Sequence, residues 1–170
     1  MSKILLKRKI FTVEEVDTTV RKRKMSADIV VEHNTVAILP ITRKGYMLVE
    51  LQYRPAIGKK IYEIPAGHME KNEKPVDCAR RELEEETGFK AGRLRQINYF
   101  YPSPGLLSKK EYFFIAEQLT KGKTSFDKHE DIITKEMSIP TALKYIKSGK
   151  IVDAKTIIAI LYYKHFMSSS

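Results

Sequence analysis

The chain has 170 residues, of which 42% are hydrophobic, which is enough for one compact domain with a core and requires no second domain. A single cysteine excludes an internal disulfide, and the sequence has neither a signal-peptide core near its start nor 18 consecutive apolar residues, so we expect a cytoplasmic protein. The formal net charge of +10 at pH 7 favours anionic substrates or polyanionic partners.

Residues 1–35 predict a β-hairpin arm. Residues 11–17 alternate apolar and polar side chains, and residues 27–32 form a second extended segment after a basic turn. We interpret the basic runs at residues 7–9 and 21–24 as solvated hairpin residues. An RNA-binding patch is the alternative, although no aromatic side chains interleave these runs.

Three further strands are expected before the first helix. Residues 36–41 form a near-continuous apolar run and residues 46–53 follow a turn at Gly45, so we expect these two strands to pair. A short strand over residues 61–64 leads into Gly67, so the loop that begins there starts from a sheet.

Residues 67–89 read GHMEKNEKPVDCARRELEEETGF and predict a loop followed by a helix. Pro75 suits the first helical turn because it has no N–H to leave unpaired, and Gly88 suits the helix end. The apolar stripe that would pack on a sheet consists of Val76, Ala79, Leu83 and Thr87. The same helical angles place Cys78 away from the core side.

Three carboxylates converge beside this stripe. At about 100° per residue, Glu82 and Glu86 fall on one flank and Glu85 lies next to them. Two such charges about 6 Å apart repel by roughly 3 kcal/mol at an effective dielectric of 20, so a cation should lie there. Clustered oxygen ligands suit Mg²⁺ or Mn²⁺. From these glutamates alone, a solvated acidic face remains the alternative.

The strands after this helix are predicted over residues 94–101 and 111–119, joined by a loop rich in proline and glycine. Residues 121–131 are polar and without periodicity. Residues 132–139 return to the sheet.

Two helices complete the chain. The first ends at Gly149, and Asp153 is a plausible N-cap for the second, over residues 154–166, whereas residues 168–170 should fray. Strands on both sides of a central helix, with a final helix for the other face, predict an α/β fold in which a mixed β-sheet is sandwiched between helices. This domain covers residues 36–167.

The segment with the three carboxylates resembles the Nudix hydrolase signature at every defined position. The matching residues are Gly67, Glu73 and the run Arg81-Glu82-Leu83-Glu84-Glu85-Glu86-Thr87-Gly88-Phe89. The resemblance implies the Nudix fold and an enzyme that cleaves the pyrophosphate of a nucleoside diphosphate linked to another moiety. It also implies divalent metal ions as cofactors, with Mg²⁺ expected and Mn²⁺ as the alternative.

The same resemblance implies roles for individual residues. The positions that match metal ligands are the carbonyl of Ala66 and the side chains of Glu82, Glu85 and Glu86. Arg81 and Glu73 match a pair that braces the loop against the helix. Gly67 matches a position where the backbone turns tightly.

Two stretches outside the signature resemble the ADP-ribose and nucleoside diphosphate sugar pyrophosphatase branch of the family. Arg54 ends a Glu-Leu-Gln-Tyr-Arg segment, where an arginine would meet a phosphate bidentately. Pro104 and Gly105 lie about fifteen residues past the signature, where this branch places a proline in a loop that could line the sugar pocket. The simpler interpretations are a strand end for Arg54 and a hairpin connection for the loop.

A third stretch with this resemblance is the segment from His129 to Ile132. It makes Glu130 the candidate for the carboxylate that activates the attacking water or completes the metal shell, with Asp127 and Glu85 as substitutes for the base. We group Glu130 and Glu85 with Arg81 as the catalytic residues. Three other histidines, His33, His68 and His165, are interpreted as structural or surface residues because no cysteine or second histidine lies at metal-ligand spacing.

The function predicted from the sequence is metal-dependent hydrolysis of ADP-ribose, or a related nucleoside diphosphate sugar, to a nucleoside monophosphate and a sugar phosphate. The alternatives are a hydrolase of GDP-mannose or another nucleoside diphosphate sugar, an RNA-cap type hydrolase, and a non-catalytic Nudix-fold binding module. The resembling branch forms dimers in which the N-terminal hairpin reaches the partner, so residues 1–35 predict a homodimer with no membrane partner.

Overall fold

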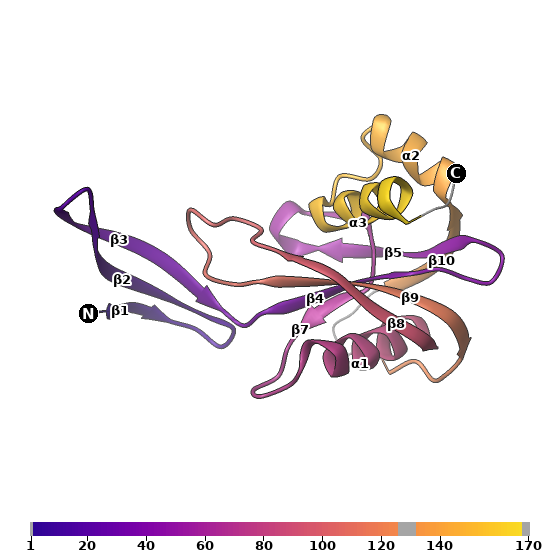
Figure 1. Cartoon of the computed structure of the whole chain (residues 1–170), viewed down its shortest axis with the longest axis horizontal. Coiled ribbons are helices and arrows are strands. Elements are labelled where there is room, and N and C mark those ends of the chain that lie inside the picture. The colour runs from indigo at the N-terminus through magenta and orange to yellow at the C-terminus, as the bar shows by residue number, and fades with distance from the viewer. Residues whose placement is uncertain (1, 126–131, 168–170) are drawn as a thin grey trace.

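The computed structural model describes residues 2–125 and 132–167, whose strands form three sheets (Figure 1). The N-terminal sheet consists of β1 (Ser2–Lys7), β2 (Phe11–Val20) and β3 (Arg23–Glu32). A second sheet, in the order β10-β5-β6, consists of β5 (Tyr46–Arg54), β6 (Lys59–Glu63) and β10 (Ile132–Ser138). The third, in the order β7-β4-β9-β8, consists of β4 (Thr35–Pro40), β7 (Ala66–His68), β8 (Phe89–Phe100) and β9 (Glu111–Lys121). The helices are η1 (Pro55–Ile57), which is 3₁₀, and α1 (Pro75–Thr87), α2 (Ile139–Lys147) and α3 (Ala154–Phe166).

The four-stranded sheet is mixed and is covered on both faces. Strand β4 runs parallel to β9 and antiparallel to β7. Its residues alternate between two cores: Val36 packs with Leu83 of α1, whereas Ala37 packs with Ile160 of α3. Helix α1 therefore lies on one side of the strands, and α2 and α3 lie on the other (Figure 1). This arrangement is the predicted mixed sheet sandwiched between helices.

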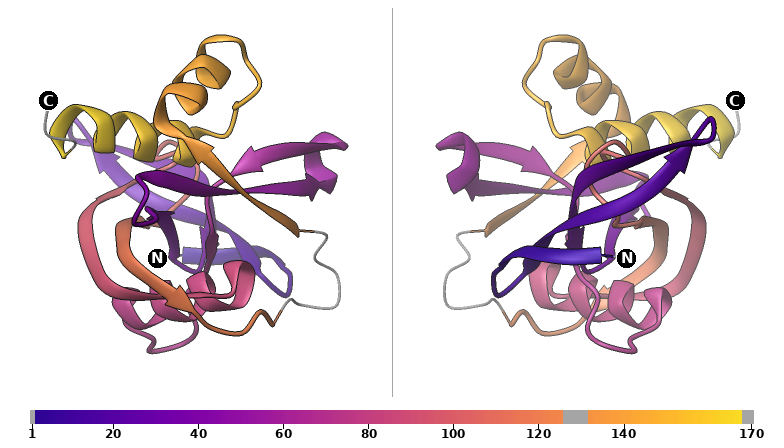
Figure 2. Two further views of the ribbon diagram at one scale, coloured as in Figure 1. Left: turned by 90° about the vertical axis from the view of Figure 1, so that its right-hand side faces the viewer. Right: turned by 90° about the vertical axis from the view of Figure 1, so that its left-hand side faces the viewer.

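The N-terminal arm has one strand more than the predicted hairpin. Strands β2 and β3 pair through ten residues around a turn at Arg21 and Lys22, and β1 adds to the outer edge of β2. The sequence pattern missed β1 because its apolar residues are consecutive and not alternating, and all six of its residues are exposed. The arm extends from the rest of the molecule along its long axis (Figure 1), and a view along that axis shows the arm in front of the other elements (Figure 2, right).

The predicted pairing of residues 36–41 with 46–53 was wrong. Both strands exist, but β4 is occupied at one edge by β7 and at the other by β9, so β5 pairs with β6 and β10 instead. The only bridge between the two segments joins Ile41 to Met47. A tight turn favours a hairpin locally, but the two edges of β4 are already paired with other strands.

Helix α1 begins and ends as predicted, and its buried face is rotated relative to the prediction. Pro75 is its first residue, and Gly88 follows it with a φ of 72°. Ala79, Leu83 and Thr87 are buried, but Val76 is exposed and Cys78 is fully buried against the sheet. The placement of Cys78 away from the core was therefore wrong, because the contact face is centred between Cys78 and Ala79.

Both predicted C-terminal helices exist, and α3 has the predicted boundaries, whereas α2 ends at Lys147, just before the predicted stop at Gly149. Asp153 accepts a hydrogen bond from the backbone N–H of Thr156 at 3.0 Å and begins α3, as predicted. Ser138 caps α2 in the same manner. In the described part of the chain, no helix combines the length and apolar character needed to cross a membrane.

Candidate active site

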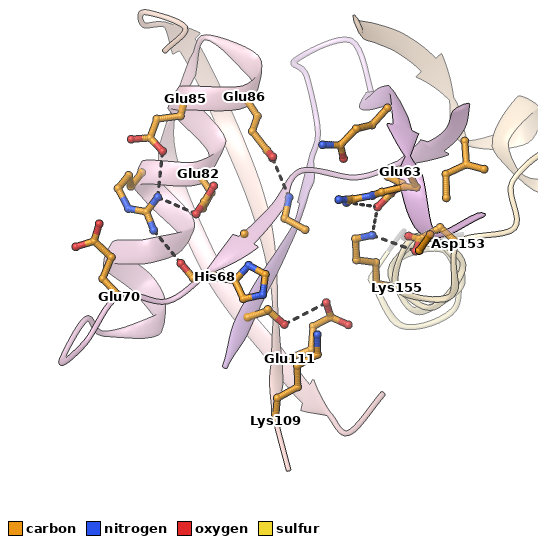
Figure 3. A pocket seen from close by; sticks show the side chains of 18 of the residues that line it. Glu63, His68, Glu70, Glu82, Glu85, Glu86, Lys109, Glu111, Asp153 and Lys155 are labelled. Carbon is orange, nitrogen blue, oxygen red and sulfur yellow. Dashed lines mark hydrogen bonds and ion pairs between the residues drawn. The ribbon is translucent and has the colours of Figure 1, made fainter. Parts of the chain in front are cut away.

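A cavity with a volume of about 790 Å³ lies between α1 and the ends of β5, β6 and α3. One side, which we name the helix wall, consists of Glu70, Arg81, Glu82, Glu85 and Glu86. The facing side, the opposite wall, consists of Arg54, Glu63, Asp153 and Lys155. Figure 3 shows the labelled glutamates of the helix wall on the side of α1, and Glu63, Asp153 and Lys155 on the facing side of the cavity.

Arg81 is the cation at the centre of the helix wall. Its Nε lies 3.0 Å from Glu73, and its Nη1 lies 2.7 Å from Glu82 and 3.0 Å from Glu85. Nη2 also donates to the backbone carbonyl of His68 at 3.1 Å, which attaches the preceding loop to α1. The hydrogen bond with Glu73 is the largest cause that raises the pKa of Arg81, and it lowers the pKa of Glu73. The contacts with Glu73 and the loop correspond to the predicted brace.

A glycine is required at position 67 because the Glu82 side chain lies close to its backbone. The expectation of a tight turn at this position was wrong. The residue lies within β7, paired with Val36, and its φ is not in the left-handed region. A Cβ at this position would lie 1.9 Å from Cδ of Glu82. The absent side chain therefore makes the space in which the Glu82 carboxylate lies.

Glu86 is buried on the same side of the cavity. The residue is 4% exposed, and its Oε2 accepts a hydrogen bond from the backbone N–H of Ala66 at 2.9 Å. This contact attaches the last turn of α1 to β7. As a result, Ala66 and Glu86 both line the cavity beside Glu82.

The helix wall fits a hard divalent cation by the chemistry of its donors. Glu82, Glu85 and Glu86 offer only oxygen atoms, and oxygen is the donor that Mg²⁺ and Mn²⁺ prefer. Among the described residues, no three acidic, histidine or cysteine side chains are arranged closely enough to hold a metal as they stand. Arg81 bridges two of these carboxylates in this arrangement.

The opposite wall is a continuous ion-pair network. Arg54 binds Glu63 through Nε at 2.6 Å and Nη2 at 2.8 Å, and Lys155 binds both Glu63 and Asp153, the latter at 3.0 Å. Burial acts to raise the pKa of Glu63, but the hydrogen bond from Arg54 and the charge of Lys155 outweigh it, so the pKa is lowered. Glu63 is therefore ionised at neutral pH. One edge of the Arg54 guanidinium is occupied by this carboxylate, whereas Nη1 makes no hydrogen bond to the described residues.

A third group of polar residues, which includes Lys109 and Glu111, also lines the cavity (Figure 3). Thr35 donates to Glu111 at 3.3 Å, and Lys109 pairs with Glu32 of β3 at 2.9 Å. Burial raises the pKa of Glu111 and lowers the pKa of His68, which also lines the cavity. The interpretation of His68 as a structural or surface residue therefore missed a cavity position.

The other predicted site residues are distributed as follows. Arg54 lines the cavity. Pro104 and Gly105 do not, and their loop contacts the arm instead, through hydrogen bonds between Val30 and the backbone of Leu106 and Ser108. The candidate bases Glu130 and Asp127 lie outside the described residues.

Most of the opposite wall was absent from the sequence prediction. Glu63, Asp153 and Lys155 are separated by up to 92 residues along the chain, and no local spacing connects them. The one feature of this wall that the sequence predicted was the N-cap at Asp153. It located the start of α3 but not the residues that Asp153 contacts in the cavity. Burial raises the pKa of the Cys78 thiol, which makes it a poor nucleophile.

Comparison with known proteins adds three findings. The chain matches the NUDIX domain family over residues 31–152. It is 38% identical to the ADP-ribose pyrophosphatase of Bacillus subtilis (strain 168), over 94% of this chain and 91% of the relative, and 34% identical to the GDP-mannose pyrophosphatase of Salmonella paratyphi B, over 75% and 71%. The fold matches a crystal structure of an ADP compounds hydrolase with a TM-score of 0.87 and 19% identity, over 98% and 91% of the two chains.

Proposed function

Because this chain belongs to the Nudix hydrolase family, we propose that it hydrolyses ADP-ribose, or a related nucleoside diphosphate sugar, to a nucleoside monophosphate and a sugar phosphate. The observation that carries this proposal is one cavity with an acidic helix wall on one side and the guanidinium of Arg54 on the other. A volume of about 790 Å³ is suited to a ligand of this size. The ADP-ribose pyrophosphatase relative supports the choice of substrate.

The helix wall is the proposed catalytic side. Glu82 and Glu86, with Glu85 and the carbonyl of Ala66, would hold divalent ions, Mg²⁺ first and Mn²⁺ as the alternative. When bound, such ions offset charge on the phosphate oxygens and lower the pKa of a water molecule. Arg81 would hold Glu82 and Glu85 in place through its contacts with both.

The chain's own residues supply orientation and proton transfer. Glu85 or Glu130 would orient the attacking water and accept its proton as the water oxygen bonds to phosphorus. The bond between this phosphorus and the bridging oxygen of the pyrophosphate breaks, and the other phosphate leaves with the bridging oxygen. Across the cavity, Nη1 of Arg54 would bind a phosphate oxygen, because Nε and Nη2 of its guanidinium are on Glu63.

A substrate panel tests this proposal. Turnover is measured with Mg²⁺ and separately with Mn²⁺ on ADP-ribose, GDP-mannose, ADP-glucose and 5′-triphosphorylated RNA, with nucleoside monophosphate and sugar phosphate detected as products. We expect ADP-ribose to be hydrolysed with the highest kcat/KM. A higher kcat/KM for GDP-mannose, the substrate in the name of the 34% identical relative, would change the proposed sugar and base of the substrate. The proposed active site would stay the same. RNA as the best substrate would contradict the proposal, and no turnover with any substrate would favour a binding module.

We also propose that residues 36–167 form the catalytic domain of a cytoplasmic homodimer in which the arm reaches the partner. Apolar side chains on the outer strand of the arm and the adjoining turn support this, since Ile4 is 57% and Ile10 59% exposed. Light scattering after size-exclusion chromatography should give twice the chain mass of 19.7 kDa, whereas a mass of one chain at micromolar concentration would contradict the dimer.

A further inference from the structure

We propose that Lys155, at the start of α3, is a positioning residue that keeps Arg54 available for the substrate phosphate. This inference rests on the proposed function. Lys155 lies outside the signature, and it acts through Glu63, which it shares with Arg54. The chemical class that Arg54 would bind is the pyrophosphate of a nucleoside diphosphate.

The first support is the position of Lys155 between two carboxylates. Its Nζ contacts Oε2 of Glu63 and lies 3.0 Å from Oδ1 of Asp153, and its side chain is only 11% exposed. Oε2 of Glu63 is the same oxygen that binds Nη2 of Arg54. Lys155 therefore neutralises two acids that would otherwise both face the guanidinium of Arg54.

The second support is the rigid attachment of Lys155. Asp153 accepts hydrogen bonds from the N–H and hydroxyl of Thr156, at 3.0 and 2.6 Å. The Thr156 hydroxyl in turn accepts from the backbone N–H of Ile64 at 2.9 Å, directly after β6. The first turn of α3 is thus fixed to the strand that carries Glu63, so the Lys155 side chain has a defined anchor.

The third support is the electrostatic effect of removing the lysine. Without Lys155, Arg54 becomes the one cation of the opposite wall, facing both Glu63 and Asp153. The hydrogen bond with Glu63 is the main cause that raises the pKa of Arg54, and the charge of Asp153 acts in the same direction. Arg54 would then be drawn toward the acids and away from the phosphate, which weakens substrate binding but leaves the helix wall intact.

A double-mutant cycle tests this inference. Lys155→Met, Arg54→Met and the double variant are compared on ADP-ribose, with Lys147→Met as a control on an exposed lysine of α2. We expect Lys155→Met to raise KM about tenfold with little change in kcat, and Lys155→Arg to recover most of this loss. In the Arg54→Met background, Lys155→Met should change KM by less than about twofold. Equal effects in both backgrounds would overturn the inference, since Lys155 would then act without Arg54.

A measurement without substrate separates this inference from the proposed function. Hydrogen exchange of the Arg54 Nε–H is followed by NMR in wild type and Lys155→Met. Slower exchange in the variant supports the inference even if ADP-ribose is not hydrolysed by wild type, in which case only the proposed substrate fails. Unchanged exchange, with wild type active on ADP-ribose, would overturn the role of Lys155 and keep the function.

Discussion

The two walls of the cavity are built in different ways. The helix wall comes from one short stretch of chain, in which Glu70 and the residues of α1 are at most sixteen positions apart. The opposite wall combines the end of β5, the end of β6 and the start of α3. A helix fixes side-chain directions by spacing alone, whereas the opposite wall exists only after the sheet and α3 have packed.

The walls also differ in charge. The helix wall has four carboxylates and one guanidinium, a formal charge of −3, whereas two cations and two carboxylates balance on the opposite wall. The excess of negative charge on the helix wall favours the binding of a cation there, whereas the balanced charges of the opposite wall do not. We therefore expect changes on the helix wall to reduce kcat, and changes on the opposite wall to raise KM.

A large effect is expected from a substitution at Gly67, because the helix wall has no spare space at this position. Gly67→Ala places a Cβ at 1.9 Å from Cδ of Glu82, so the carboxylate must move. We expect kcat to fall about a hundredfold, because a displaced ligand loses most of its contribution. Steady-state kinetics on ADP-ribose measure this, with circular dichroism to confirm that the variant is folded. A folded variant with normal kcat would show that the position of Glu82 is unimportant.

A smaller effect is expected from Arg81→Lys. Lysine keeps the charge but cannot contact Glu73, Glu82 and Glu85 together, as the planar guanidinium does. We expect a loss of about tenfold in kcat. The matched control is Arg80→Lys, because Arg80 donates to the carbonyl of Ala91 outside the cavity. Equal losses in the two variants would mean that the brace has no specific role.

The smallest effect separates stability from substrate binding. Asp153→Ala and Ser138→Ala each remove an N-cap, at α3 and α2, and should each lower the free energy of unfolding by about 1 kcal/mol. Only the Asp153 variant should also change KM, because Asp153 contacts Lys155. Urea denaturation and kinetics measure the two effects. An equal KM in both variants would place Asp153 outside the binding network.

The contrast between the walls also explains what could be predicted from the sequence. Pro75, Gly88 and Asp153 gave helix boundaries because turns and caps act over a few residues. The pairing of β4 was missed because it depends on which distant strands take its two edges, and the burial of Cys78 because it depends on how α1 is rotated against the sheet. Arg54 was found through the resemblance of its segment to a family branch, whereas no such signal pointed to its partner Glu63.

The most direct test of the catalytic role of the helix wall compares two glutamates of α1. Glu82 lines the cavity, whereas Glu84 pairs with Lys90 at 3.3 Å and is not among the cavity residues. Turnover of ADP-ribose with Mg²⁺ is measured for Glu82→Gln and Glu84→Gln. We predict that kcat falls by about a hundredfold or more for Glu82→Gln and stays within about threefold of wild type for Glu84→Gln. An unchanged kcat for Glu82→Gln would contradict the assignment of the chemistry to this wall.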